Sequence, residues 1–421
     1  MTAARPLDGL RVVDCSTVLA GPYCTMVLAD LGADVVKVEP PDGDATRTWG
    51  PPWVGSGATR TAAYYLSVNR NKRSIVLDLR TSDGAAVLRR LLAGADVFVE
   101  NFRAGGLDRL GFSDEDLERL NPALVHLAIS GSGTTGPDAA KPGYDFVAQA
   151  AAGLMSVTGF PDAAGGAPTK VGVAIGDVAT GLFGAVGVLA SVVGRQRAVA
   201  APATAAVPGI RVDVSLLEST LALLINQAQN AFVTGRQPAR RGNAHPNIVP
   251  YEAFDTADVP IVVAVGSERQ WPRFCEALGL DHLAGDPRFR TNADRVTWRD
   301  ALRPLIAARL AERPGAEWLA ALDEADVPCG PVNDVLAAIE SPQARARGMD
   351  LRIRHPDLGE IRQVGSPIKL DGAAAAPSLA PPLPGEDTTG ILAELGYDEE
   401  WIAAFRRGEP GAEPRGEAGT S

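Results

Sequence analysis

Short runs of β-branched and other apolar residues recur through the first third of the chain, separated by longer stretches with helical spacing of apolar positions. These runs predict strands at 11–16, 35–39, 74–79, 95–101 and 124–130. Parallel neighbours in a sheet need long crossover connections, which are usually helices. The alternation therefore predicts a large, doubly wound α/β domain, a Rossmann-like parallel sheet with helices on both faces.

Helix start signals fall between these strands. Gly21-Pro22 follows the first strand, and proline is tolerated in the first turn of a helix. Residues 82–93 have a helical pattern, and Ser113–Asp116 has the sequence of a helix cap. Further on, residues 142–194 are mainly helical and apolar, and residues 212–233 also have a helical pattern.

The second half of the chain predicts a smaller α+β domain at 225–330. Its elements are a strand at 261–266 and helices such as 270–278, 297–310 and 315–325. We expect the large domain to cover 1–212 and to be completed by the C-terminal segment 335–405.

Three stretches do not fit regular elements. The Ala/Pro-rich stretch 196–209 is typical of a surface linker, and residues 372–384 are expected to cross a surface without regular structure. The tail 407–421 is expected to be disordered.

Composition narrows the possible partners. The chain has 421 residues, more than one ordinary core accommodates, which favours two domains. Its 40 basic and 51 acidic residues give a net charge of -11, which argues against nucleic-acid and membrane-surface binding. The uncharged run 178–194 is short and contains glycines, so it predicts a buried helix instead of a membrane span. The N-terminus has no apolar signal core, so we expect a cytoplasmic protein.

The sequence predicts no metal site, no disulfide framework and no permanently bound cofactor. The four cysteines form no C-x-x-C pair, and the four histidines lack metal-ligand spacing. No G-x-S-x-G motif of a serine hydrolase is present. Residues 131–136 match the dinucleotide fingerprint G-x-G-x-x-G, but Pro137 and Pro142 interrupt the helix that should open there. We interpret this segment as a glycine loop.

Asp177 is the only charged residue between Lys170 and Arg195. Such an isolated carboxylate either caps a helix or is a chemical group, and the pattern alone leaves both open. The glycines at 172, 176 and 181 predict that another molecule, such as a thioester, approaches the backbone closely. A carboxylate with a reference pKa of about 3.9 is ionised at neutral pH and needs no base to act as a nucleophile.

Ordered motifs from Pro6 to about Leu370 resemble those of the family III coenzyme A transferases. The matching segments are Leu19-Ala20-Gly21-Pro22, Leu28–Glu39, Asn69–Ser74, Asp96–Phe102, Gly143-Tyr144-Asp145 and Gly176-Asp177. The resemblance implies an enzyme that moves CoA from an acyl-CoA donor to a free carboxylic acid, with acyl-CoA as substrate. It also implies an interlocked homodimer with the active site between the large domain of one subunit and the small domain of the other.

The resemblance also assigns residue roles. Asp177 is implied to be the nucleophile, which forms an acyl anhydride and then an aspartyl-CoA thioester. The implied CoA pocket consists of Thr17, Val18, Ala20, Leu77, Arg80, Asn101, Phe102, Arg109 and Tyr144. The candidate contacts for the carboxylic acid substrate are Arg47, Arg70, Asp145 and His245.

Other motifs, at 46–52, 64–72, 248–254 and 327–333, resemble family members that use succinyl-CoA and glutarate, so we expect a dicarboxylate acceptor. Formyl-CoA transferases have histidine and glutamine in place of Thr17 and Leu19, which disfavours a formyl/oxalate specificity. Two alternatives are an α-methylacyl-CoA racemase and a non-catalytic CoA-binding protein. The racemase needs a second acid/base, and its histidine is replaced here by Tyr144, a poor base at pH 7.

Overall fold

The computed structural model describes residues 5–200, 209–374 and 379–409, and the chain forms two compact units. The first unit contains the chain up to Ala152, then Gly172–Leu224, and the chain from Pro342 onward. The second unit contains Gly153–Val171 and Ile225–Ser341. The sequence predicted an insertion at 225–330, whereas residues 153–171 also pack with that unit. Residues 410–421 of the expected tail lie outside the described residues.

A parallel sheet forms the centre of the first unit. Its strands run in the order β5-β2-β1-β6-β7-β8, and each neighbouring pair is parallel. The bounds are β1 (Arg11–Asp14), β2 (Asp34–Glu39), β5 (Lys72–Val76), β6 (Val97–Glu100), β7 (Val125–Ser130) and β8 (Ile210–Ser215). The predicted strands are all present, but the helical prediction from 212 onward was wrong for β8.

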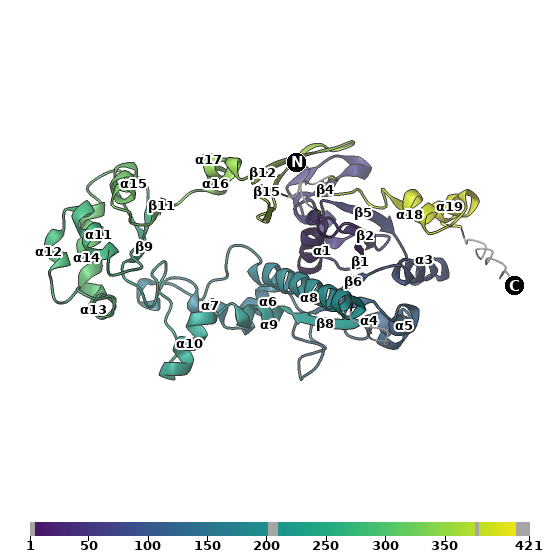
Figure 1. Ribbon diagram of the computed structural model, residues 1–421, viewed down its shortest axis with the longest axis horizontal. Coiled ribbons are helices and arrows are strands. Elements are labelled where there is room, and N and C mark those ends of the chain that lie inside the picture. The colour runs from purple at the N-terminus through teal and green to yellow at the C-terminus, as the bar shows by residue number, and fades with distance from the viewer. Residues whose placement is uncertain (1–4, 201–208, 375–378, 410–421) are drawn as a thin grey trace. The chain divides into compact units, whose positions relative to one another are not determined.

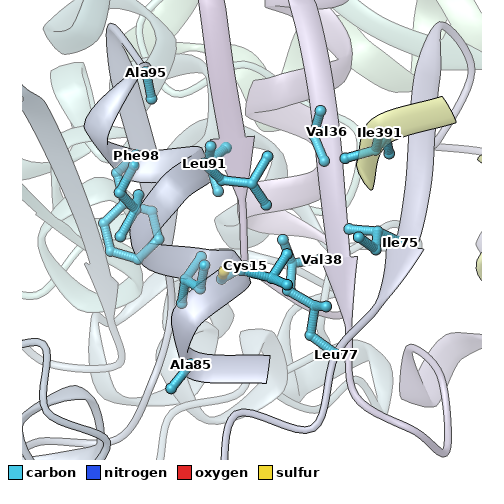
Figure 2. Close-up of a cluster of buried hydrophobic side chains, with 14 of the residues drawn as sticks. Cys15, Val36, Val38, Ile75, Leu77, Ala85, Leu91, Ala95, Phe98 and Ile391 are labelled. Atoms are coloured by element: carbon cyan, nitrogen blue, oxygen red, sulfur yellow. The ribbon is translucent and has the colours of Figure 1, made fainter. Parts of the chain in front are cut away.

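Helices cover both faces of this sheet because successive strand residues point to opposite sides. Val12 and Val35 pack with α1 (Ala20–Asp30) and α8 (Ile175–Ala200). Val13 and Val36 pack with α3 (Ser82–Ala93) and with α18 (Thr388–Glu394). Figure 2 shows this second cluster, with Ile391 of α18 beside Val36 and Ile75. The C-terminal segment therefore completes the core of the first unit.

Helix α8 lies beside α1 (Figure 1). Its segment Ile175–Ala198 is long and apolar enough to cross a membrane by length and composition alone. Val188 and Val192 are buried against the sheet, as in the core helix of a globular unit. The helix extends to Ala200, so the prediction of a linker from 196 was wrong for its first residues, where alanine and arginine favour helix. Residues 201–208 of that linker lie outside the described residues.

The remaining elements of the first unit are short. They are η1 (Ala45–Thr48), β3 (Trp53–Val54), η2 (Gly57–Thr59), β4 (Thr61–Ala62), α2 (Ala63–Leu66), α4 (Gly106–Arg109), α5 (Asp114–Leu120), α6 (Asp145–Ala151), α9 (Leu216–Ala222), α17 (Pro342–Ala346), β12 (Asp350–His355), β13 (Gly359–Val364), β14 (Lys369–Leu370), β15 (Ala373–Ala374) and α19 (Glu399–Arg406).

The second unit has its own core. An antiparallel sheet in the order β11-β10-β9 packs against helices around Trp271, Phe274 and Trp318. Its elements are α7 (Leu154–Val157), η3 (Asp162–Ala164), α10 (Ile225–Thr234), β9 (Tyr251–Phe254), β10 (Ile261–Ala264), α11 (Gln270–Leu278), α12 (Asp281–Ala284), α13 (Asn292–Thr297), α14 (Arg299–Leu310), α15 (Gly315–Glu324), β11 (Cys329–Pro331) and α16 (Val335–Glu340).

Candidate active site

A cavity of about 260 Å³ opens where β1, β6 and β7 end. The strand order reverses between β1 and β6, and ligands of doubly wound sheets bind at such a switch point, outside the carboxyl ends of the strands. The loops after these strands and the start of α8 supply the walls. The lining includes Thr17, Val18, Leu19, Ala20, Asn101, Phe102, Arg103, Ser130, Gly131, Lys141, Tyr144, Asp177 and Leu216.

Asp177 lies in the first turn of α8 and lines this cavity, although its residue surface is only 9% exposed. The carboxylate of Asp145, at the start of α6, instead accepts a hydrogen bond from the Gly176 N–H at 2.8 Å. The Gln149 side chain holds Asp145 in turn through a 2.7 Å hydrogen bond. Among the described residues, the Asp177 carboxylate accepts no hydrogen bond. The Asp145 carboxylate therefore accepts the hydrogen bond of a backbone N–H in the first turn of α8. The Asp177 carboxylate does not cap the helix and is free to react with a ligand in the cavity.

The protonation of Asp177 differs from the prediction made from its reference value. Burial, and secondarily the negative charge of Asp145, raise the pKa of Asp177 to about 7. The expectation that this carboxylate is fully ionised at neutral pH was therefore wrong for the unliganded chain. Such a shifted acid in a cleft is typical of a functional site.

Two of the glycines around Asp177 serve internal packing. A Cβ atom on Gly181 would lie 2.6 Å from the Ala20 carbonyl oxygen of α1. A Cβ atom on Gly176 would lie 2.8 Å from the Thr220 hydroxyl oxygen. Other parts of the protein occupy the space beside these two glycines. The sequence had predicted that a thioester would approach the backbone there. Only Gly172 of the three has open space beside it in the described part of the chain.

Most of the predicted CoA residues lie together. Thr17, Val18, Ala20, Asn101, Phe102 and Tyr144 all line the cavity that contains Asp177. The Asn101 amide makes two hydrogen bonds to the backbone of Thr17, at 3.0 and 2.8 Å. These bonds join the loops that follow β1 and β6.

Three other predicted CoA residues do not line the cavity. Leu77 is fully buried in the hydrophobic cluster beside Val38 (Figure 2). Arg80 is exposed and pairs with Asp78 at 2.8 Å. Arg109 is exposed at the end of α4.

Two of the predicted substrate contacts are engaged in buried ion pairs. Arg47 pairs with Glu39 at 2.6 Å, and Arg70 pairs with Asp30 at 2.6 Å. Neither arginine lines the cavity. His245 belongs to the second unit, where its carbonyl oxygen accepts a 2.8 Å hydrogen bond from Arg299. Burial and the charge of Arg299 lower the pKa of the His245 ring.

The sequence reasoning missed three polar side chains. Arg103 and Lys141 line the cavity, and Arg103 has no ion pair within the described ranges. Burial and the charges of Asp177 and Asp145 raise the pKa of Tyr64 to about 12, which places this protonated hydroxyl in the field of the two carboxylates. For Arg103, the position directly after Asn101-Phe102 was an available signal. For Tyr64, the sequence offered no geometric signal.

The residues around the cavity support neither a dinucleotide-binding site nor a metal site. The loop from Gly131 to Gly136 opens no helix, so it lacks the dipole that a dinucleotide pyrophosphate requires. Within residues 5–200, 209–374 and 379–409, no group of histidine, cysteine or acidic side chains is arranged to hold a metal ion.

Comparison with known proteins identifies the family of the chain. The family model of CoA-transferase family III matches residues 7–388. The succinate--glutarate CoA-transferase of Agrobacterium fabrum is 41% identical over 93% of this chain and 96% of its own length. The human succinyl-CoA:glutarate CoA-transferase is 38% identical over 96% of this chain and 89% of its own. The acetyl-CoA:oxalate CoA-transferase of Acetobacter aceti is 40% identical over 87% of this chain and 90% of its own.

The fold agrees as well. The crystal structure of a CAIB/BAIF family protein from Brucella suis superposes with a TM-score of 0.80 at 40% identity, and it covers 93% of this chain and 100% of its own. The range matched by the family model, residues 7–388, includes the parallel sheet, the cavity and Asp177. The chain therefore belongs to CoA-transferase family III and is an enzyme.

Proposed function

We propose that this enzyme transfers CoA from an acyl-CoA donor such as succinyl-CoA to a free dicarboxylic acid, with Asp177 as the nucleophile. The observation that carries this proposal is the position of Asp177. Its carboxylate has no hydrogen-bond partner in the described chain and faces a cavity at the switch point of the sheet. The names of the relatives support succinyl-CoA as the donor and a dicarboxylate as the acceptor.

In the first half-reaction, ionised Asp177 attacks the thioester carbonyl and forms a C–O bond. The tetrahedral intermediate expels CoA thiolate and leaves a mixed anhydride between Asp177 and the acyl group. The thiolate then attacks the aspartyl carbonyl, which releases the donor as a free carboxylate. Asp177 now carries CoA as a thioester.

In the second half-reaction, the acceptor carboxylate attacks the aspartyl thioester and expels CoA thiolate again. The thiolate attacks the acceptor carbonyl of the new anhydride, which yields the new acyl-CoA and regenerates Asp177. Each step exchanges one energy-rich acyl bond for another, so no ATP is consumed.

The cavity offers groups that suit coenzyme A. Arg103 and Lys141 are cations that can face its phosphates, and Phe102 offers an aromatic side chain against adenine. Lys141 also pairs with Asp138 at 2.7 Å, so it has an alternative partner when no phosphate is present. The overall negative charge of the chain makes such local cations necessary for binding an anion.

The active unit in this proposal is a cytoplasmic homodimer of interlocked chains. The exposure of helix α10 is evidence for a partner chain, because none of the residues of this helix is buried. Phe232 and Val233 on this helix are 78% and 76% exposed, which is unusual for apolar side chains without a partner. On α8, Val186 is 63% exposed as well.

Two experiments test the proposal. The first incubates the enzyme with succinyl-CoA and measures CoA transfer to a panel of mono- and dicarboxylic acids. The second adds hydroxylamine during turnover to trap the covalent intermediate. We expect transfer to dicarboxylates and a hydroxamate on Asp177 during turnover. Asp177→Ala should lose at least about 10³-fold in kcat and stay folded, whereas Asp326→Asn, a surface carboxylate in the second unit, should not change it. Retained turnover in Asp177→Ala would refute the mechanism.

A further inference from the structure

A turn with an unfavourable backbone forms one wall of the cavity. Val18 has a φ of 73°, in the left-handed region that β-branched residues rarely adopt. Val18 and its neighbours Thr17 and Leu19 all line the cavity. A conformation of this kind persists only when the surrounding structure holds it, and such residues cluster at functional sites.

Three contacts hold this turn, which we define as residues 16–18. Asn101 bonds to the backbone of Thr17, and the Val18 N–H lies 3.4 Å from the Asp44 carboxylate. The Lys37 ammonium donates a 2.9 Å hydrogen bond to the Ser16 carbonyl oxygen. Asn101 lines the cavity itself, whereas Lys37 and Asp44 do not.

Lys37 and Asp44 are fully buried and lie 3.0 Å apart. The Asp44 carboxylate also accepts hydrogen bonds from the backbone N–H and the hydroxyl of Thr46, at 2.9 and 2.7 Å. Its own N–H donates to Glu39 at 2.9 Å. Removing two charges from water is expensive, and well-packed apolar residues often serve stability equally well. A buried pair aimed at a strained turn therefore points to a role in holding geometry.

We propose that Lys37 and Asp44 are positioning residues that hold the 16–18 turn in its left-handed conformation and thereby keep the cavity shaped for acyl-CoA. This inference rests on the proposed function, because it assumes that acyl-CoA binds in this cavity. Without the pair, Val18 would relax toward a negative φ and the turn would leave its place in the wall. The apparent affinity then falls by the fraction of molecules in the competent conformation.

The test uses the full chain and the double variant Lys37→Met, Asp44→Asn, which removes both charges at nearly constant volume. Titration calorimetry gives the Kd for CoA, and steady-state kinetics with succinyl-CoA give KM and kcat separately. We expect Kd and KM to rise about tenfold or more, with a smaller change in kcat. Thermal unfolding and circular dichroism report whether each variant is folded.

Adding Val18→Gly to the double variant separates positioning from a purely structural role. Glycine adopts positive φ without strain, so in a Val18→Gly background the Lys37→Met, Asp44→Asn pair should raise Kd less than about threefold over the Val18→Gly variant alone. The matched control adds Asp326→Gly, which relieves another positive φ, 54°, in the second unit and should restore nothing. If the double variant does not fold, Asp44→Asn alone replaces it, with an expected rise in Kd of about threefold that is absent when the comparison is made in the Val18→Gly background.

The inference is overturned if the folded variant binds CoA as tightly as wild type, or if the charge removal weakens binding as much in the Val18→Gly background as it does with Val18 present. Failure of the proposed function looks different, because wild type itself would then neither bind CoA in the titration nor transfer it.

Discussion

At the scale of single residues, burial and the neighbouring charge of Asp145 raise the pKa of Asp177 to about 7. The sequence identified Asp177 because it is isolated in apolar sequence, and it predicted an ordinary carboxylate. Its raised pKa arises from burial and from Asp145, which is far away along the chain. Such a shift depends on tertiary contacts, so residue spacing could not predict it. A carboxylate that is partly protonated at pH 7 makes the reaction pH dependent.

We expect kcat/KM to increase with pH up to about 7 and to level off above it, because only ionised Asp177 attacks the thioester. Below that pKa, the rate should fall about tenfold per pH unit. Asp145→Asn removes the neighbouring charge and should move this limb to lower pH, while Asp326→Asn should leave it in place. A pH–rate profile between pH 5 and 9 measures both, and an unmoved limb in Asp145→Asn would contradict the assigned cause.

The same shift predicts a cost in stability. The folded pKa of Asp177 is about 7 and the ordinary value is 3.8, so the folded state favours the protonated form. The contribution of Asp177 to the free energy of unfolding is therefore most favourable below pH 4. This contribution is lost as the pH rises to about 7. The loss amounts to at most about 4 kcal/mol.

Asp177→Asn should remove this cost. We expect the variant to unfold at a higher temperature than wild type at pH 8, and the difference to shrink toward zero at pH 4. Thermal denaturation at both pH values measures it. If the variant and wild type differ in unfolding temperature by the same amount at both pH values, ionisation of Asp177 does not destabilise the folded protein.

At the scale of elements, a buried ion pair fixes the end of β2. The Glu39 carboxylate accepts hydrogen bonds from Arg47 at 2.7 and 2.6 Å and from the Ser74 hydroxyl at 2.8 Å. Arg47 also donates a 3.0 Å hydrogen bond to the Pro382 carbonyl oxygen of the C-terminal segment. Burial opposes ionisation of Glu39, but the Arg47 hydrogen bonds and charge outweigh it and lower the pKa to about 2.

Glu39→Gln should therefore destabilise the protein at pH 7 by about 3 kcal/mol, because Arg47 loses its countercharge inside the protein. The folded pKa lies below the ordinary value of 4.5, so this contribution is present above pH 4.5 and is lost as the pH falls toward 2. Urea unfolding at pH 7 and pH 3 measures the difference. The matched control is Glu360→Gln, which removes an exposed pair with Arg352 and should cost less than about 1 kcal/mol.

The sequence predicted elements well where one local signal dominated. Strands β1, β2, β5, β6 and β7 follow from β-branched runs, and α5 follows from the capping pattern at Ser113. The prediction failed for β8, whose alternating pattern Ile210–Ser215 passes directly into a helix. Arg47 and Arg70 show a different limit, because a sequence does not reveal which basic side chains have acidic partners across the fold.

At the scale of the whole molecule, the alternation of strands and helices predicted the parallel sheet, and the structure places the cavity where β1, β6 and β7 end. Six of the predicted CoA residues line the cavity because they follow β1, β6 and β7. All nine predicted CoA residues came from family correspondence, and Leu77, Arg80 and Arg109 do not line the cavity. The sequence could not predict the exposed apolar side chains of α10, because a helical pattern does not show which face of the helix another chain covers.

This exposure gives the last prediction. If α10 packs against a second copy, wild type should sediment as a dimer, since burying Phe232 and Val233 removes apolar surface from water. Phe232→Asp places a charge in that contact and should reduce the dimer fraction or the yield of folded protein, whereas Arg273→Asp, at an exposed ion pair of the same unit, should not. Analytical ultracentrifugation across a hundredfold concentration range measures the mass. A wild-type monomer that transfers CoA would contradict the interlocked dimer, because a single chain would then hold the complete active site.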